Sequence, residues 1–104
     1  MAFRLRFVQR YRPASREKFM EIEAKFAAME RRRGEYPEGR RLEPYTGRDA
    51  TNTIVCEFEF ETLAEAEGAL AMISADSEHD ALLSEQLPYM EDSYTEIYQV
   101  LDFE

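Results

Sequence analysis

His79 is the only histidine of the chain, and its side chain is the first candidate for chemistry. An imidazole takes up and releases protons near neutral pH, so one interpretation is a proton shuttle. The alternative is a half-exposed residue in the first turn of a short helix, close to Glu78 and Asp80. A zinc site needs three or four ligands, so one histidine without a second ligand predicts no metal.

A second candidate group consists of charged residues at alternating positions, namely Arg4, Arg6, Glu57, Glu59 and Glu96. They could bind a carboxylate or act as general acids and bases. If they pair with one another across strands, they form a ladder of ion pairs with a structural role. The two interpretations are compatible if one charge is left unpaired.

The tyrosines near the last predicted strand are a third group. Tyr89, Tyr94 and Tyr98 could line a pocket for an aromatic or enol-like substrate. Tyrosines are equally ordinary at a dimer interface, because they combine apolar area with a polar tip.

The remaining motifs are weaker. Cys56 alternates with Ile54 and Phe58, which indicates a buried small hydrophobe rather than a nucleophile. The arginine runs at 31–33 and 40–41 could form an anion site, with a solvated helix end as the alternative. The sequence has no Gly-rich phosphate loop, no Ser-His-Asp set and no Cys-x-x-Cys.

Length and charge limit the possible functions. A chain of 104 residues predicts a single domain over 1–104, and 44% hydrophobic residues are enough for a core. The net charge of −9 argues against binding to nucleic acid or to an anionic membrane. No apolar run approaches the roughly 20 residues that span a bilayer. One cysteine cannot form an intrachain disulfide, so we expect a cytoplasmic protein.

Hydrophobic periodicity predicts four strands and three helices. Alternation predicts strands over residues 3–11, 40–45, 53–61 and 94–103. Phe19, Ile22, Phe26 and Met29 form one helical stripe, and Thr62 with Glu65 is a capping box that opens a second helix. Asp76 and Ser77 are typical helix N-cap residues, and they predict the start of a short third helix with Leu82, Leu83 and Leu87.

The distribution of charge favours one topology. All 13 basic residues lie between Arg4 and Arg48, whereas the following 56 residues carry 15 acidic ones and no Lys or Arg. The βαββαβ order predicts a ferredoxin-like α+β fold with a four-stranded antiparallel sheet of order 4-1-3-2 and helices on one face. That order puts the arginines of the first strand between two acidic strands, where facing opposite charges stabilise by roughly 0.2–1 kcal/mol each.

The sheet face opposite the helices predicts a homodimer. Val8, Val55, Val100, Tyr94 and Tyr98 lie on that face by parity. We expect a second copy of the chain to cover them, because the helices are committed to the other face.

Three stretches carry a family resemblance, namely Arg10-Tyr11-Arg12-Pro13, the passage Ile54 to Glu67, and the tail Gln86-Leu87-Pro88-Tyr89-Met90 with Glu96 to Leu101. They resemble the dimeric α+β barrel superfamily, which includes NIPSNAP-like, antibiotic-biosynthesis monooxygenase-like and muconolactone isomerase-like proteins. The tail is most similar to NIPSNAP-like proteins. The resemblance implies two protomers that pack sheet against sheet, with any ligand between a sheet and its helices. It also raises a haem-ligand role for His79, but haem-degrading members use an Asn, Trp and His set, and this chain has no Trp.

The resulting hypothesis is a small dimeric α+β barrel protein that binds an organic ligand between sheet and helices. The alternative is a cofactor-independent enzyme of the monooxygenase or isomerase type. We expect no cofactor and no metal. The catalytic candidates are His79, Tyr98 and Arg6, and the ligand-binding candidates are Arg4, Arg6, Glu57, Tyr94 and Tyr98.

Overall fold

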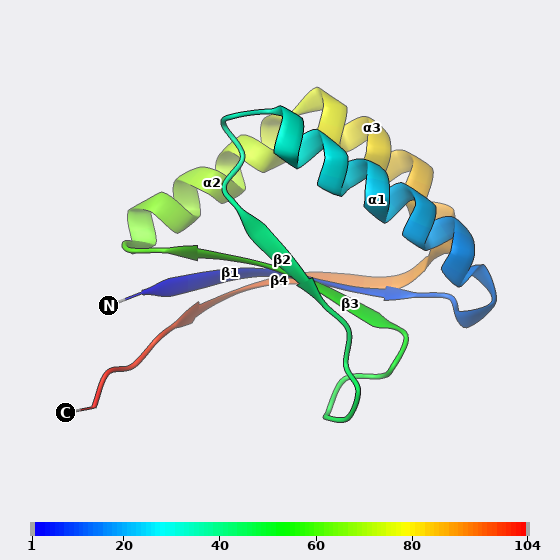
Figure 1. The fold of residues 1–104 in the computed structure, drawn as a ribbon, viewed down its shortest axis with the longest axis horizontal. Helices are drawn as coiled ribbons and strands as arrows, with labels where there is room; N and C mark the ends of the chain where they lie inside the picture. The colour runs from blue at the N-terminus through cyan, green and yellow to red at the C-terminus, as the bar shows by residue number, and fades with distance from the viewer. Residues whose placement is uncertain (1, 104) are drawn as a thin grey trace.

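The computed structural model describes residues 2–103 and has the predicted order of elements. The three helices lie on one side of a four-stranded sheet (Figure 1). No helix within residues 2–103 has the length and apolar character needed to cross a membrane. The elements are β1 Phe3–Tyr11, α1 Arg16–Arg32, β2 Gly39–Leu42, β3 Thr53–Phe60, α2 Leu63–Ala75, α3 Ser77–Gln86 and β4 Met90–Gln99, with short 3-10 turns η1 Pro13–Ser15 and η2 Leu87–Tyr89.

The sheet order is β2-β3-β1-β4 with every neighbouring pair antiparallel, which confirms the predicted order 4-1-3-2. The register puts Arg6 opposite Glu57 on one side and opposite Glu96 on the other. Side chains alternate between faces along each strand, so β1 sends Leu5 and Phe7 toward the helices and its arginines to the open face.

The core lies between the sheet and the helices. Phe19 and Leu5 are fully buried, and Ile22, Phe26 and Met29 of α1 are buried as the helical stripe predicts. The Thr62 side chain accepts a hydrogen bond from the Glu65 backbone, so the predicted capping box begins α2. Asp76 caps α3 by accepting from the backbone N–H groups of Glu78 and His79.

Two sequence-based expectations near the C-terminus are wrong. The last strand covers Met90–Gln99 rather than 94–103, because η2 leads directly into a strand that pairs along nearly the whole of β1. Leu101 and Phe103 therefore lie beyond the strand and are 62% and 89% exposed, not covered by helices. In α3 the fully buried residue is Gln86, whereas Leu87 falls in η2 and is exposed.

The open face carries the predicted ladder of ion pairs. Arg4 Nε lies 3.2 Å from Glu59 Oε1, and Arg6 Nε lies 3.3 Å from Glu57 Oε2. Arg6 Nη1 also lies 3.3 Å from Glu96 Oε1. The structural interpretation of these residues is therefore confirmed: the first strand is central, and its arginines pair with acidic residues on both neighbouring strands.

The valines of the open face differ from expectation. Val8 is 2% exposed and Val55 4% exposed within a single chain, so neither valine requires a partner to cover it. Their neighbours explain this burial, because Val8 pairs with both Val55 and Tyr94 and lies between Arg6 and Arg10, whose side chains are long. Tyr94 and Tyr98 remain 43% and 50% exposed.

The edge strand β2 depends on a glycine. A Cβ added at Gly39 would lie 2.3 Å from a ring carbon of Phe58, which is its partner across the β2–β3 pair and is 2% exposed. We expect Gly39→Ala to lower the free energy of unfolding by about 1–3 kcal/mol, because the buried ring or the edge strand must move. Urea unfolding followed by circular dichroism measures this change.

Gly68→Ala is the matched control for that substitution. Gly68 lies within α2, and an added Cβ would meet nothing within 4 Å. This variant should gain about 0.4–1 kcal/mol, because alanine restricts the unfolded chain and favours the helix. Equal effects of the two substitutions would contradict the proposed contact with Phe58.

Candidate functional site

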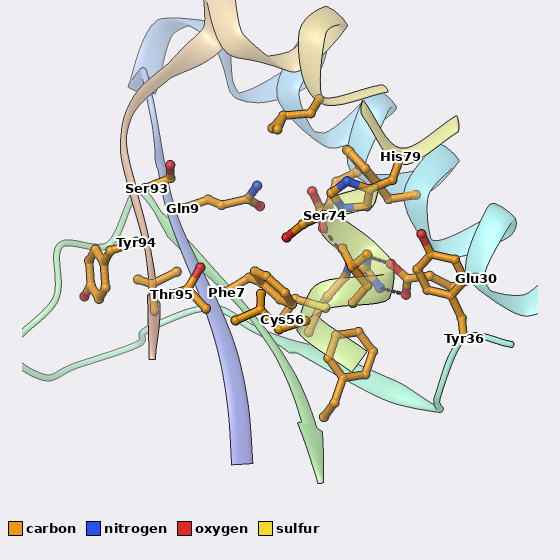
Figure 2. Close-up of a pocket in the computed structure, with 18 of the residues that line it drawn as sticks. Phe7, Gln9, Glu30, Tyr36, Cys56, Ser74, His79, Ser93, Tyr94 and Thr95 are labelled. Atoms are coloured by element: carbon orange, nitrogen blue, oxygen red, sulfur yellow. Dashed lines mark hydrogen bonds and ion pairs between the residues drawn. The ribbon is translucent and has the colours of Figure 1, made fainter. Parts of the chain in front are cut away.

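A cavity of about 330 Å³ lies between the helix-facing side of the sheet and the helices (Figure 2). Its walls come from all three helices, all four strands and the segment before β2. The residues of these elements that line it are Phe7, Val8, Gln9, Glu23, Phe26, Glu30, Tyr36, Arg41, Cys56, Phe58, Leu70, Ile73, Ser74, His79, Asp80, Leu83, Ser93, Tyr94 and Thr95.

One part of the wall is apolar. Phe7 and Phe58 meet edge to face with ring centroids 6.1 Å apart, and Leu70 and Ile73 of α2 pack against the same core. The alternation of β1 and β3 aims both phenylalanines at the helices. Aromatic and aliphatic side chains of this kind form the larger part of most small-molecule sites.

A charged part of the wall contains Arg41 between two glutamates of α1. Arg41 Nε lies 2.6 Å from Glu23 Oε2, and Arg41 Nη2 lies 2.8 Å from Glu30 Oε2. The third nitrogen of the guanidinium, Nη1, donates to Glu30 Oε1 at 3.1 Å. The guanidinium is therefore neutralised by the protein itself, which ties the edge strand β2 to α1.

Buried amides extend this polar wall toward β1. Gln86 is fully buried, and its Nε2 donates to Glu23 Oε1 at 2.9 Å. Gln9 Nε2 donates to Gln86 Oε1 at 3.5 Å, so the amide of Gln9 links the network to the cavity. Buried polar groups need such partners, because an unsatisfied one costs about 1–3 kcal/mol.

His79 lies in the wall formed by α3. Its ring packs on Phe26 with centroids 4.9 Å apart at 57°. Burial lowers the pKa of His79, and the nearby carboxylates of Asp76 and Glu30 offset only part of that effect. The imidazole is therefore mainly neutral at pH 7 and can accept a proton.

Asp76 fixes the helix turn that carries His79. It accepts a hydrogen bond from Tyr36 Oη at 2.6 Å and lies 2.6 Å from Arg33 Nη1. Its other oxygen accepts from the backbone N–H groups of Glu78 and His79. The Tyr36 hydrogen bond, followed by that of Arg33, holds the pKa of Asp76 far below its ordinary value.

Cys56 is a free, buried thiol that lines the cavity. Burial raises the pKa of Cys56 to about 12, with nearby Arg41 opposing part of that rise. The side chain is therefore a protonated thiol near neutral pH, in keeping with its prediction as a small hydrophobe rather than a nucleophile.

Comparisons with known proteins identify the fold. No family model and no curated protein matches the chain. A NIPSNAP family protein from Agrobacterium tumefaciens superposes with a TM-score of 0.76 at 11% identity, over 99% of this chain and 96% of that one. An antibiotic biosynthesis monooxygenase superposes with a TM-score of 0.73 at 9% identity, over 96% and 99% of the two chains. The chain has the α+β fold of the NIPSNAP and antibiotic biosynthesis monooxygenase proteins.

A further structure with this fold is a cofactor-independent oxygenase from Streptomyces nogalater. It superposes with a TM-score of 0.64 at 14% identity, over 98% of this chain and 95% of that one. The sequence resemblance to the dimeric α+β barrel superfamily is thus confirmed at the level of the fold. Identities this low transfer no residue roles from those proteins to this chain.

Of the predicted site residues, only His79 reaches the cavity with its side chain. Arg4, Arg6 and Glu57 belong to the ion-pair ladder of the open face. Tyr98 lies on that face too, where Arg6 stacks 5.1 Å from its ring centroid. Figure 2 shows Tyr94 pointing away from the cavity, and its hydroxyl donates to Asp49 Oδ1 at 3.3 Å.

The two arginine runs form no common anion site. Arg41 faces the cavity and pairs with α1, whereas Arg40 pairs with Glu57 on the open face at 3.2 Å. Arg33 is bound to Asp76. Adjacent residues of a strand point to opposite faces, so a run of two arginines in β2 is divided between them.

Gln9, Glu23 and Arg41 were missed as cavity residues. Gln9 is a polar residue on the strand face of β1 that is otherwise apolar, and Glu23 lies next to the apolar stripe of α1. The sequence pattern could therefore have indicated both residues. Within residues 2–103, no group of three or more His, Cys, Asp or Glu could hold a metal ion.

The lowered pKa of Asp76 predicts a pH dependence. A carboxyl whose pKa is lower in the folded state contributes stability above its unfolded pKa of about 3.9 and loses it as pH falls toward the folded value. Asp76→Asn keeps a capping side chain but removes the charge. The stability difference between the wild-type protein and this variant should be full above about pH 5 and shrink below about pH 4.

Urea unfolding at several pH values measures this difference. Asp102→Asn, in the exposed tail, is the control and should match the wild-type protein at each pH. A difference for Asp76→Asn that does not change between pH 7 and pH 3 would contradict the role given to the charge.

Proposed function

We propose that the chain binds a small, mostly apolar organic molecule in the cavity between the sheet and the helices. The cavity itself is the observation that carries the proposal: about 330 Å³ falls within the range of ligand pockets, roughly 300–1,000 Å³.

Polar groups from separate elements support this proposal. Gln9 of β1, Ser74 of α2, His79 of α3 and Thr95 of β4 all line the same cavity. A few convergent polar groups in a largely apolar wall can orient a ligand and select it. Ser74 and Thr95 are exposed, which indicates that the cavity opens between β4 and the end of α2.

A second candidate function is a cofactor-independent enzyme of the monooxygenase or isomerase type. The neutral imidazole of His79 in the cavity wall is the observation that favours it, because such a group can remove an acidic C–H proton from a bound ligand. The Streptomyces oxygenase shows that this fold can host cofactor-independent chemistry.

The binding proposal predicts that a neutral bicyclic probe, 2-naphthalenemethanol, occupies the cavity. In a titration of ¹⁵N-labelled protein, backbone amides of Gln9, Ser74 and His79 should shift with a Kd of about 1 mM or tighter. Thr95→Phe should weaken binding by roughly tenfold, because the larger ring fills space that the ligand needs. Thr46→Phe is the matched control and should bind like the wild-type protein, because residue 46 is exposed in the loop between β2 and β3 and does not line the cavity.

The enzyme candidate is tested with the same protein and 2-tetralone, a bicyclic ketone with acidic α-hydrogens. If His79 acts as a base, the protein accelerates exchange of these hydrogens with deuterium from the solvent. His79→Gln should then reduce the acceleration by about 10²-fold while 2-naphthalenemethanol still binds. Absence of any acceleration by the wild-type protein would contradict the enzyme candidate and leave the binding proposal intact.

We further propose that the protein is a cytoplasmic homodimer that associates through its open sheet face. The half-exposed rings of Tyr94 and Tyr98 supply apolar area there, and the apolar residues Leu101 and Phe103 extend beyond β4. The charges of this face are paired within the sheet, so a partner can cover them without leaving a lone charge buried. The free thiol of Cys56 supports a reducing compartment.

Sedimentation equilibrium at about 10 µM should give twice the monomer mass of 12.2 kDa, since a stable interface needs about 800 Å² per partner. Tyr98→Asp should raise the dimer Kd by about tenfold or more. Tyr45→Asp is the control, because Tyr45 lies in a loop and is 95% exposed. A folded wild-type chain that sediments as a monomer would refute the dimer.

A further inference from the structure

We propose that the cavity selects an organic amine, that is, a mostly apolar molecule that carries one ammonium group. This inference rests on the proposed binding function and names the chemical class of the ligand. It follows from the charges of the cavity wall and from the contacts that leave some of those charges uncompensated.

The wall has an excess of negative charge. Glu23, Glu30 and Asp80 contribute three carboxylates, whereas Arg41 is the one guanidinium among the described residues that line the cavity. Arg41 is in ion-pair contact with Glu23 at 2.6 Å and with Glu30 at 2.8 Å. An incoming carboxylate or phosphate would have to displace one of these partners, so Arg41 offers an anion no vacant place.

Within residues 2–103, no Lys and no Arg other than Arg41 lines the cavity. Burial lowers the pKa of His79, so its imidazole is mainly neutral at pH 7 and compensates little of the excess. The whole chain carries a net charge of −9, which raises the local concentration of cations at its surface. The carboxylates of the wall would repel an organic anion that entered the cavity. This repulsion is stronger there than in water, because the effective dielectric constant is lower.

The structure offers a place for the ammonium group near Asp80. Asp80 lies in the first turn of α3 beside His79, and within residues 2–103 its carboxylate takes part in no ion pair. Ser74 and Thr95 line the same cavity, and their hydroxyls can accept hydrogen bonds. The apolar body of the ligand would then lie against Phe7, Phe26 and Leu70.

Three probes with one ring system and different charges test the inference. They are 2-naphthylmethylamine, 2-naphthalenemethanol and 2-naphthoate, each titrated into ¹⁵N-labelled protein at pH 7 and low salt. We expect the amine to bind about tenfold or more tightly than the carboxylate, with the alcohol between them. Asp80→Asn should weaken binding of the amine by about 2- to 5-fold and leave the affinity for the alcohol unchanged.

Asp102→Asn is the matched control, because it removes the same charge from the whole chain. Residue 102 lies in the C-terminal tail, which runs away from the three helices (Figure 1). Equal weakening of the amine by both substitutions would show general attraction to an acidic protein and would overturn the inference. So would amine binding that persists in Thr95→Phe, because the amine would then lie outside the cavity.

The possible outcomes distinguish a failure of the amine inference from a failure of the proposed binding function. If the alcohol binds in the cavity and the carboxylate binds as tightly as the amine, the amine inference fails and the binding proposal stands. If none of the three probes shifts the amides of Gln9, Ser74 and His79, the binding proposal itself fails. If the amine binds most tightly of the three probes and its affinity depends on Asp80, the result supports both the amine inference and the binding proposal.

Discussion

The fold depends on a central strand whose positive charges lie between two negatively charged neighbours. Arg6 of β1 contacts Glu57 of β3 and Glu96 of β4, each at 3.3 Å. Glu57 also lies 3.7 Å from Arg4 and 3.2 Å from Arg40, so three arginines from two strands meet one nearly buried carboxylate. A carboxylate in that position without its partners would cost several kcal/mol, which disfavours any sheet order that separates them.

The same central strand divides the molecule into two surfaces with different physical properties. On the open face, long charged side chains and tyrosines cover Val8 and Val55, which gives a flat surface with balanced charge. On the other face, Phe7 and Gln9 contribute to a cavity between the strands and the helices. Strand alternation accounts for this division, since each step along β1 changes the face that a side chain reaches.

The sequence predicted the features that depend on local pattern and on summed charge. The alternation of Phe3, Leu5 and Phe7, the Thr62 cap and the segregation of charge together led to the correct elements and sheet order. The boundaries of β4 were wrong because its early residues, including Glu91 and Asp92, are polar on both faces and carry no periodic signal. Their place in the sheet is set by pairing with β1.

The cavity was less predictable than the fold. His79 was predicted as a catalytic candidate because it is unique in the chain, whereas Arg41 was predicted only as part of a run of arginines that could form an anion site or a solvated helix end. Whether Arg41 faces the cavity depends on the register of a four-residue edge strand with β3. The cavity itself is the space that eight segments of the chain leave between them, so no single segment encodes it.

The exposed edge of β4 has a consequence for the behaviour of the protein at high concentration. This strand has ten residues and lies at the edge of the sheet, so one row of its backbone N–H and C=O groups faces solvent. Such unpaired groups can pair with a strand of another molecule. Glu91, Asp92 and Glu96 bring negative charge to that strand, and it contains no lysine or arginine. These carboxylates already pair with Arg6 and Arg10 of their own chain, so two copies that met edge to edge along β4 would gain backbone hydrogen bonds but no ion pairs between the two strands.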